Sequence, residues 1–230
     1  MDVAQTMESA TSLRDTVLRR VRADIVSGYA APGTMYSVPT LAEEVGISTT
    51  PVREALLELS YSGLITPVRN RGFRVEATTL KDLKNGFALR ELLERFAMVN
   101  LAEQRLTDTE PLRKLADDIA AAVKREDGRA YIEGDRAFHL ALVSRLNNPQ
   151  LTKMIMELRD SMRLYGLDSA AGRQRQVASV KEHYQFIDLA AAGKTDAISK
   201  LVTHHIRTWE PVFTAGLAQQ VDRPVQSRGR

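Results

Sequence analysis

VPTLAEEVGISTTPVREALLE, residues 38–58, is the stretch that decides the fold of the N-terminal part of this chain. Its first half predicts a short amphipathic helix over 38–45, which Gly46 ends. A cap of small hydroxyl residues follows, and Pro51 then stands in the first turn of a second helix over 49–61, where its missing N–H costs nothing. Two helices joined by a tight glycine turn predict a helix-turn-helix, whose second helix presents its N-terminal side chains to a DNA major groove.

The segments on either side extend this unit. Apolar spacing predicts a helix over 12–27 ahead of it, and two short strands over 64–68 and 72–76 after it, around the polar turn 69–71. Three helices and a β-hairpin make a winged helix-turn-helix, which we expect to span residues 12–76.

Side chains suited to DNA occur at two places in this unit, the start of the second helix and the hairpin turn. Hydroxyls and free helix N–H groups suit phosphate oxygens, and an arginine one turn further on suits a guanine edge or a phosphate. A glycine in the turn permits a backbone geometry that other residues resist. The predicted DNA-binding residues are Ser48, Thr49, Thr50, Arg53, Arg69, Arg71 and Gly72. The alternative is a solvated surface on a winged helix that binds protein.

Charge and composition limit the remaining choices. The chain carries a net charge of +3, and its first 77 residues hold eight arginines and nine acidic residues, so DNA contact must come from locally clustered arginines. There is no cysteine, which excludes disulfides and thiolate metal sites. Neither a signal peptide nor a membrane span is visible, and this predicts a cytoplasmic protein.

The pattern becomes purely helical after a predicted linker at 77–79. Breaks at glycine, asparagine and proline divide residues 80–217 into six candidate helices, which we expect to form an all-α antiparallel bundle. The terminal segments 1–11 and 218–230 are expected to be disordered. The fold class is therefore mainly α. The six candidate helices are 80–105, 109–126, 128–146, 148–165, 172–192 and 194–217.

Three histidines of the helical part are predicted to face inward. Asp135 and His139 are four residues apart and share a helix face, while His183 and His205 lie on apolar stripes of two other helices. Each alone could be a core histidine held by a backbone or carboxylate bond. Together, an uncompensated buried polar cluster is costly, and a divalent metal (Zn, Ni, Mn or Fe) bound by three imidazoles and one carboxylate would remove that cost.

Arg90 and Ser179 are the candidates for binding a small ligand beside this metal. Arg90 lies on a partly apolar stripe, so it either pairs with a carboxylate such as Glu94 or points into the cavity, where it would clamp a carboxylate. Ser179 precedes His183 by one helical turn and could add a hydrogen bond. Arg163 and Arg175 are weaker candidates, for which a solvated surface position is an equal alternative.

The N-terminal part resembles a known family in several motifs. TPVREAL at 50–56, GLI at 63–65 and RGFRV at 71–75 look like the DNA-binding domain of GntR-family transcriptional regulators. The resemblance implies a winged helix that binds an operator. Thr49 stands where the family usually has an arginine that contacts DNA, so the operator sequence is expected to differ.

The helical part resembles the FadR-like (FCD) branch of that family. Asp135 and His139, the pair Glu182-His183, and His205 twenty-two residues after His183 carry the resemblance. It implies a metal-binding effector domain that accepts small organic acids. It also implies that the arginine of the first effector-domain helix, Arg90 here, faces the ligand.

The leading hypothesis is a homodimeric transcription factor whose affinity for a double-stranded DNA operator is controlled by a small carboxylate effector. One head offers too few base contacts, so paired heads would read paired half-sites. The alternative is a metal-dependent enzyme acting on a small organic acid, with the winged helix as an interaction module. Against it, Glu182 as general base would point about 100° away from His183 on a helix. A metal-stabilised structural bundle without an effector is the third hypothesis.

Overall fold

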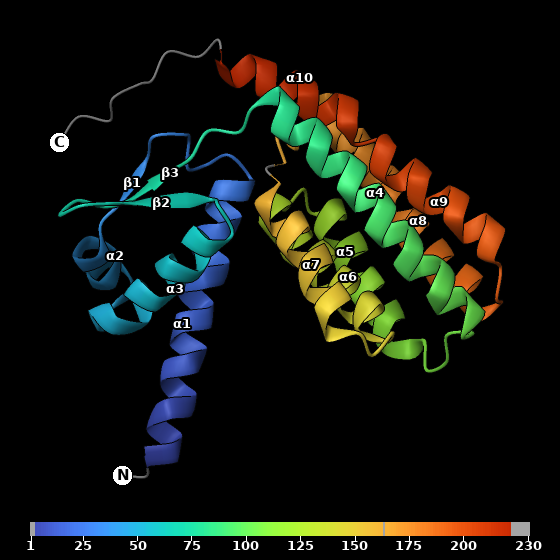
Figure 1. Cartoon of the computed structure of the whole chain (residues 1–230), viewed down its shortest axis with the longest axis horizontal. Helices are drawn as coiled ribbons and strands as arrows, with labels where there is room; N and C mark the ends of the chain where they lie inside the picture. The colour runs from blue at the N-terminus through green and yellow to red at the C-terminus, as the bar shows by residue number, and fades with distance from the viewer. Residues whose placement is uncertain (1–2, 163, 222–230) are drawn as a thin grey trace. The chain divides into compact units, whose positions relative to one another are not determined.

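The computed structural model describes residues 3–162 and 164–221 and divides into two units (Figure 1). The first is built on the chain up to Thr78, and the second on the chain from Thr79 onward. In this described part, no helix combines the length and apolarity that crossing a membrane requires. The first unit contains α1 (Val3–Val26), β1 (Met35–Tyr36), α2 (Val38–Val45), α3 (Thr49–Tyr61), β2 (Ile65–Val68) and β3 (Gly72–Val75).

The first unit is a winged helix-turn-helix, as the sequence predicted. The Ser37 side chain caps α2, and Gly46 ends it in the left-handed conformation with φ 71°, so the chain turns directly into α3. The strands form an antiparallel sheet in the order β1-β3-β2, and β2 and β3 are the wing. Helices and sheet enclose one core, in which Val52, Leu56 and Phe73 are buried.

Gly72 is required where the wing meets β1. Its φ of +107° is a conformation that side chains rarely adopt. A Cβ at this position would lie 2.1 Å from the carbonyl oxygen of Tyr36. The glycine thus lets β3 pair closely with β1, a strand of only two residues that no alternation in the sequence could reveal.

The N-terminal helix is longer than the sequence predicted. α1 begins at Val3, whereas the interpretation from sequence started the helix at Ser12 and left residues 1–11 disordered. The reason is local, because no proline or glycine occurs between Val3 and Val26 and good helix formers continue toward the N-terminus.

The second unit is all-helical, which confirms the predicted fold class. Its first helix opens with a capping box, in which the Thr79 hydroxyl accepts from the Asp82 N–H and the Asp82 carboxylate accepts from the Thr79 N–H. The helices of this unit are α4 (Leu80–Glu103), α5 (Glu110–Lys124), α6 (Gly128–Ser144), α7 (Pro149–Ser161), α8 (Ala170–Ala191), α9 (Thr195–Arg207) and α10 (Glu210–Val221).

Several helix boundaries of this unit differ from the predicted ones. The segment expected as one helix over 194–217 is two, α9 and α10, because Pro211 has no N–H to donate to the carbonyl of Arg207. α10 runs to Val221, into the segment predicted to be disordered, while residues 222–230 lie outside the described chain. α7 ends at Ser161, and α8 begins earlier than predicted because Ser169 caps it by accepting from the Gly172 N–H.

Candidate metal centre and nucleic-acid interface

Four side chains from three helices of the second unit meet in its interior. α6 carries Asp135 and His139 one turn apart, α8 carries His183, and α9 carries His205. One donor atom from each lies within 4.8 Å of the donor atoms of the other three. The imidazole ring centroids form a nearly equilateral triangle with sides of 5.4, 5.5 and 5.5 Å. Since metal–ligand bonds are about 2 Å long, only small side-chain shifts would bring these donors to one cation.

The donor atoms of this cluster are buried and poorly satisfied. The three imidazoles are at most 5% exposed, whereas Asp135 is 19% exposed. Nε2 of His139 and both ring nitrogens of His183 are buried and make no hydrogen bond within the described chain. Asp135 Oδ1 faces both rings, at 3.2 Å from His183 Nε2 and 3.7 Å from His139 Nε2. Buried polar atoms without partners are rare, and a divalent cation would supply the missing partner here.

The two carboxylate oxygens of Asp135 contact different partners. Oδ1 faces the imidazoles, while Oδ2 accepts a hydrogen bond from Arg159 Nη2 at 2.6 Å. Arg159 Nη1 also donates to Glu94 Oε2 at 2.8 Å, and the other oxygen of Glu94 accepts from Arg90 Nε at 2.7 Å. A buried charge network therefore joins the cluster on α6 to α7 and α4, and it orients the carboxylate that faces the rings.

His205 is oriented by a carboxylate on α8. Its Nδ1 lies 2.6 Å from Glu182 Oε2, so Nδ1 carries the proton that it donates, and Nε2 keeps its lone pair for the centre of the cluster. Arg175 donates to the same Glu182 oxygen and lies with its guanidinium carbon 5.4 Å from the Trp209 ring centroid. Glu182 is thus a positioning residue, and its other oxygen faces the exposed His204 at 3.5 Å.

Burial keeps His139 and His205 neutral, and the charge of Arg159 keeps Asp135 ionised. Burial, together with the positive charge of Arg159, holds the pKa of His139 well below its usual range, and burial lowers the pKa of His205 to about 4. Burial would raise the pKa of Asp135, but the positive charge of Arg159 holds it well below its ordinary value. Neutral imidazoles and an ionised carboxylate are the protonation states that bind metal.

The structure pairs Arg90 with a carboxylate, one of the two arrangements the sequence left open. Arg90 is 5% exposed and its partner is Glu94. Ser179 is fully buried, lies 3.1 Å from the Tyr131 hydroxyl, and donates to the carbonyl of Gln176. The surface alternative for Arg175 is wrong, because it is buried and paired, and Arg163 lies outside the described residues.

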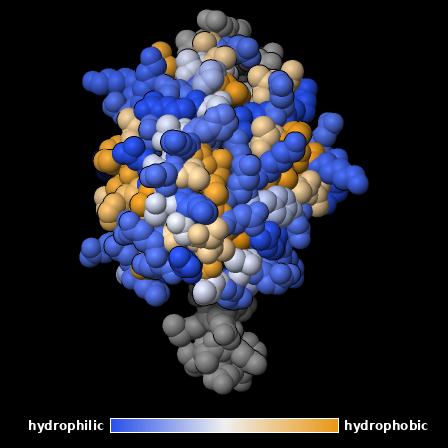
Figure 2. All heavy atoms as spheres, turned by 90° about the vertical axis from the view of Figure 1, so that its right-hand side faces the viewer, coloured by the Kyte–Doolittle hydropathy of each residue, from blue (hydrophilic) through white to orange (hydrophobic). Residues whose placement is uncertain are grey.

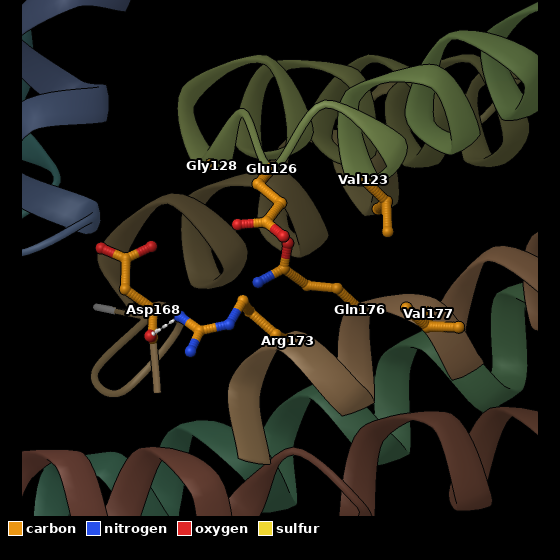
Figure 3. Close-up of a pocket in the computed structure, with 7 residues that line it drawn as sticks. All are labelled: Val123, Glu126, Gly128, Asp168, Arg173, Gln176 and Val177. Atoms are coloured by element: carbon orange, nitrogen blue, oxygen red, sulfur yellow. Dashed lines mark hydrogen bonds between the residues drawn. The ribbon is translucent and has the colours of Figure 1, made fainter. Parts of the chain in front are cut away.

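A separate pocket of about 220 Å³ opens near the N-terminal ends of α6 and α8 (Figure 3). It contains none of the residues predicted from sequence to bind metal or effector. The Arg173 side chain donates to the Asp168 carbonyl at one edge of it, and Gln176 donates to the carbonyl of Leu167. The lining residues are Val123, Glu126, Gly128, Asp168, Arg173, Gln176 and Val177.

The side chains predicted to bind DNA are exposed on the first unit. Ser48 precedes α3 with extended backbone, and its side chain makes no capping hydrogen bond. Its hydroxyl is therefore not bonded to the first N–H groups of α3. Thr49, Thr50 and Arg53 are exposed on the first turns of α3. Arg69 and Arg71 are exposed in the turn of the wing, and Gly72 is half-buried at its base.

A winged helix-turn-helix followed by an all-helical unit defines a class of two-part bacterial transcriptional regulators. Residues 13–75 match the family described as bacterial regulatory proteins, gntR family, and residues 86–208 match the FCD domain. The Nta operon transcriptional regulator of Aminobacter aminovorans is 33% identical over 187 residues, which cover 79% of this chain and 85% of that protein.

Solved structures agree with this assignment. E. coli McbR/YncC superposes with a TM-score of 0.75 at 26% identity, covering 91% of this chain and 99% of that chain. A putative GntR regulator from Rhodococcus sp. RHA1 shares the fold with a TM-score of 0.69 at 22% identity, covering 89% and 98% of the two chains. The chain belongs to the GntR family of bacterial transcriptional regulators and carries its FCD domain. These relatives are DNA-binding regulators rather than enzymes, so the enzyme alternative is set aside.

Proposed function

We propose that this regulator binds a divalent metal through Asp135, His139, His183 and His205, and that a small carboxylate bound beside the metal controls its affinity for operator DNA. The observation that carries the proposal is the cluster of three buried imidazoles and one carboxylate whose donor atoms lie within 4.8 Å of one another, with nitrogens of His139 and His183 that have no hydrogen-bond partner in the described chain. Three nitrogens and one oxygen suit Zn, Ni, Mn or Fe and leave coordination positions for a ligand.

The charge balance of the interior supports an anionic effector. In the metal-free protein, the buried cations Arg90 and Arg159 are balanced by Glu94 and Asp135. A divalent cation in the cluster leaves this set with two net positive charges in a region of low dielectric constant. Because uncompensated buried charge is costly, a carboxylate that binds the metal and draws Arg90 away from Glu94 would be favoured.

The DNA-binding end of the proposal rests on α3 and the wing. We assign phosphate contacts to Ser48, Thr49 and Thr50, base or phosphate contact to Arg53, and flanking contacts to the wing. The assigned wing residues are Arg69, Arg71 and Gly72. One such head reads few bases, so the proposal includes a homodimer that places two heads on paired half-sites. An effector changes affinity only through its preference for one arrangement of the heads.

The metal is tested first with adjacent histidines as a matched pair. His205 faces the cluster and His204 is 62% exposed, so the two alanine variants differ in burial but share helix and residue type. We expect metal added to chelator-treated wild type and His204→Ala to raise the melting temperature, and to leave His205→Ala unchanged. Wild-type protein that binds none of the four metals would refute the metal part of the proposal.

The regulatory part is tested by fluorescence anisotropy on DNA from the promoter region of the chain's own gene. We expect wild-type protein to bind this DNA, Arg53→Ala to lose most of the affinity, and small carboxylic acids to change the affinity only when metal is present. Binding that carboxylic acids change equally with and without metal would contradict the proposed effector site. No binding under any metal or acid condition would refute the assigned DNA surface.

A further inference from the structure

α4 carries apolar side chains on two faces, and one of these faces packs against other helices of the unit. Leu83, Phe87, Ala97 and Leu101 are buried against the other helices of the unit. On a second face, Leu89, Leu92 and Phe96 are exposed by 48, 57 and 57%. In the space-filling view of Figure 2, hydrophobic side chains gather in a few places on a largely hydrophilic surface. Contiguous exposed apolar surface on a folded protein commonly marks a contact with another molecule.

The spacing of the exposed face is that of a coiled-coil seam. Successive steps of four and three residues lead from Asn85 to Leu89, Leu92, Phe96, the half-buried Val99 and Glu103. A stripe with a mean spacing of 3.5 residues stays in line with one partner helix over several turns. A broader stripe would be expected if this face were covered by several elements of the same unit. The seam therefore fits a single long helix as its partner.

The charges at the two ends of the seam indicate which helix that is. Lys81 lies on the same face before the apolar residues, and Glu103 lies after them, both exposed. Leu92 is midway between Lys81 and Glu103 in sequence. A second copy of α4 in antiparallel orientation would therefore bring Lys81 against Glu103 at both ends and place Leu92 against itself, with Leu89 and Phe96 of the two copies within one residue of direct opposition.

We infer that α4 pairs antiparallel with α4 of a second copy of this chain, about a twofold axis at Leu92. This inference rests on the homodimer of the proposed function and specifies its contact surface. The parallel arrangement is disfavoured, because it would place Lys81 against Lys81 and Glu103 against Glu103. An isologous contact also doubles the effect of every substitution, since each residue occurs twice in the interface.

The first test measures self-association of the full chain by analytical ultracentrifugation. Leu92→Glu would bury two like charges at the axis, so we expect the dimer dissociation constant to rise at least about a hundredfold. Met154→Glu is the matched control, because Met154 is 53% exposed, close to the 57% of Leu92, but lies on α7 and not on α4. We expect this control to dimerise as wild type does. Circular dichroism checks that both variants are folded.

The second test determines the orientation of the helices by charge exchange. Lys81→Glu and Glu103→Lys each place like charges together, and we expect each to weaken the dimer about three- to tenfold. The double exchange should restore wild-type association. Either substitution favours α4 itself, because it adds an acid to the first turn or a base to the last, so weaker association would not reflect a weaker helix.

The outcomes separate this inference from the homodimer itself. Wild type that stays monomeric at all concentrations overturns both the homodimer and its α4 contact. A Leu92→Glu variant that dimerises like wild type leaves the homodimer standing and refutes the α4 contact, as does a double exchange that fails to restore association. Metal binding, measured on the same samples, is independent of either result.

Discussion

Glutamine at position 182 should weaken metal binding without removing any metal ligand. Glu182 Oε2 accepts from His205 Nδ1 at 2.6 Å, which leaves Nε2 as the donor to a metal. A glutamine amide can rotate and donate to Nδ1 instead, and the imidazole then carries its proton on the metal side. Loss of such an outer partner typically costs about 10- to 100-fold in metal affinity, or about 1.4–2.7 kcal/mol.

The same substitution has a second, separable effect on stability. Arg175 is 7% exposed and loses its carboxylate partner, and breaking a buried ion pair costs about 3–5 kcal/mol. The Trp209 ring and the His205 carbonyl remain close to the guanidinium, so we expect the lower end of that range. Urea unfolding of the metal-free protein measures this loss, and competition with a chelator measures the metal affinity.

A double variant distinguishes the two effects. Glu182→Gln combined with Arg175→Met removes the uncompensated charge but leaves His205 without its carboxylate. We expect the free energy of unfolding to recover and the metal affinity to stay low. A Glu182→Gln protein that binds metal within a factor of two of wild type would refute the role of Glu182, and recovery of affinity in the double variant would show that the loss was only structural.

Three further predictions concern the interior and the wing. In metal-free protein, the unfolded state protonates His205 near pH 6.5 and the folded state only near pH 4, so the free energy of unfolding should fall as pH drops through this window, by up to about 3 kcal/mol. Urea titrations at several pH values measure this fall, which should be smaller in His205→Gln. Arg159→Met removes the partner of the Glu94 and Asp135 carboxylates and should lower the free energy of unfolding, measured by chemical denaturation, by about 3–5 kcal/mol. Arg159→Lys should not restore the wild-type stability, since a lysine cannot replace the guanidinium fork. Gly72→Ala places a Cβ against the Tyr36 carbonyl and should cost about 2 kcal/mol or more in thermal melting, and an unchanged melting curve would contradict this.

The sequence was sufficient to predict which side chains meet in the helical unit. Asp135 and His139 share a face because they are one turn apart, and apolar neighbours placed His183 and His205 inward, where the structure brings all four together. The apolar stripe of a helix marks the side that is buried, so hydrophobic periodicity in the sequence indicates which polar side chains face inward. Whether the cluster holds a metal is a separate question, which the experiments above address.

The partners of these side chains were harder to predict. Arg159 touches Asp135 and Glu94 through packing of α7 on α6 and α4, and no local pattern marks it. The sequence does indicate the pairing of Arg175, because it precedes Glu182 by seven residues, or two helical turns, and the two side chains therefore share one face of α8. Glu182 points away from its neighbour His183, as expected from the helix, and serves His205 instead.

α4 brings together three of the features described above. Its capped first turn follows the division between the units at Thr79, one side carries Arg90 and Glu94 of the buried charge network, and another side carries the exposed seam around Leu92. Random mutagenesis of this helix should therefore yield unrelated phenotypes from adjacent codons. Under the two proposals above, an allele at 94 would alter the proposed response to a carboxylate and one at 92 would alter the proposed self-association, so binding assays and ultracentrifugation would sort the mutants into two groups.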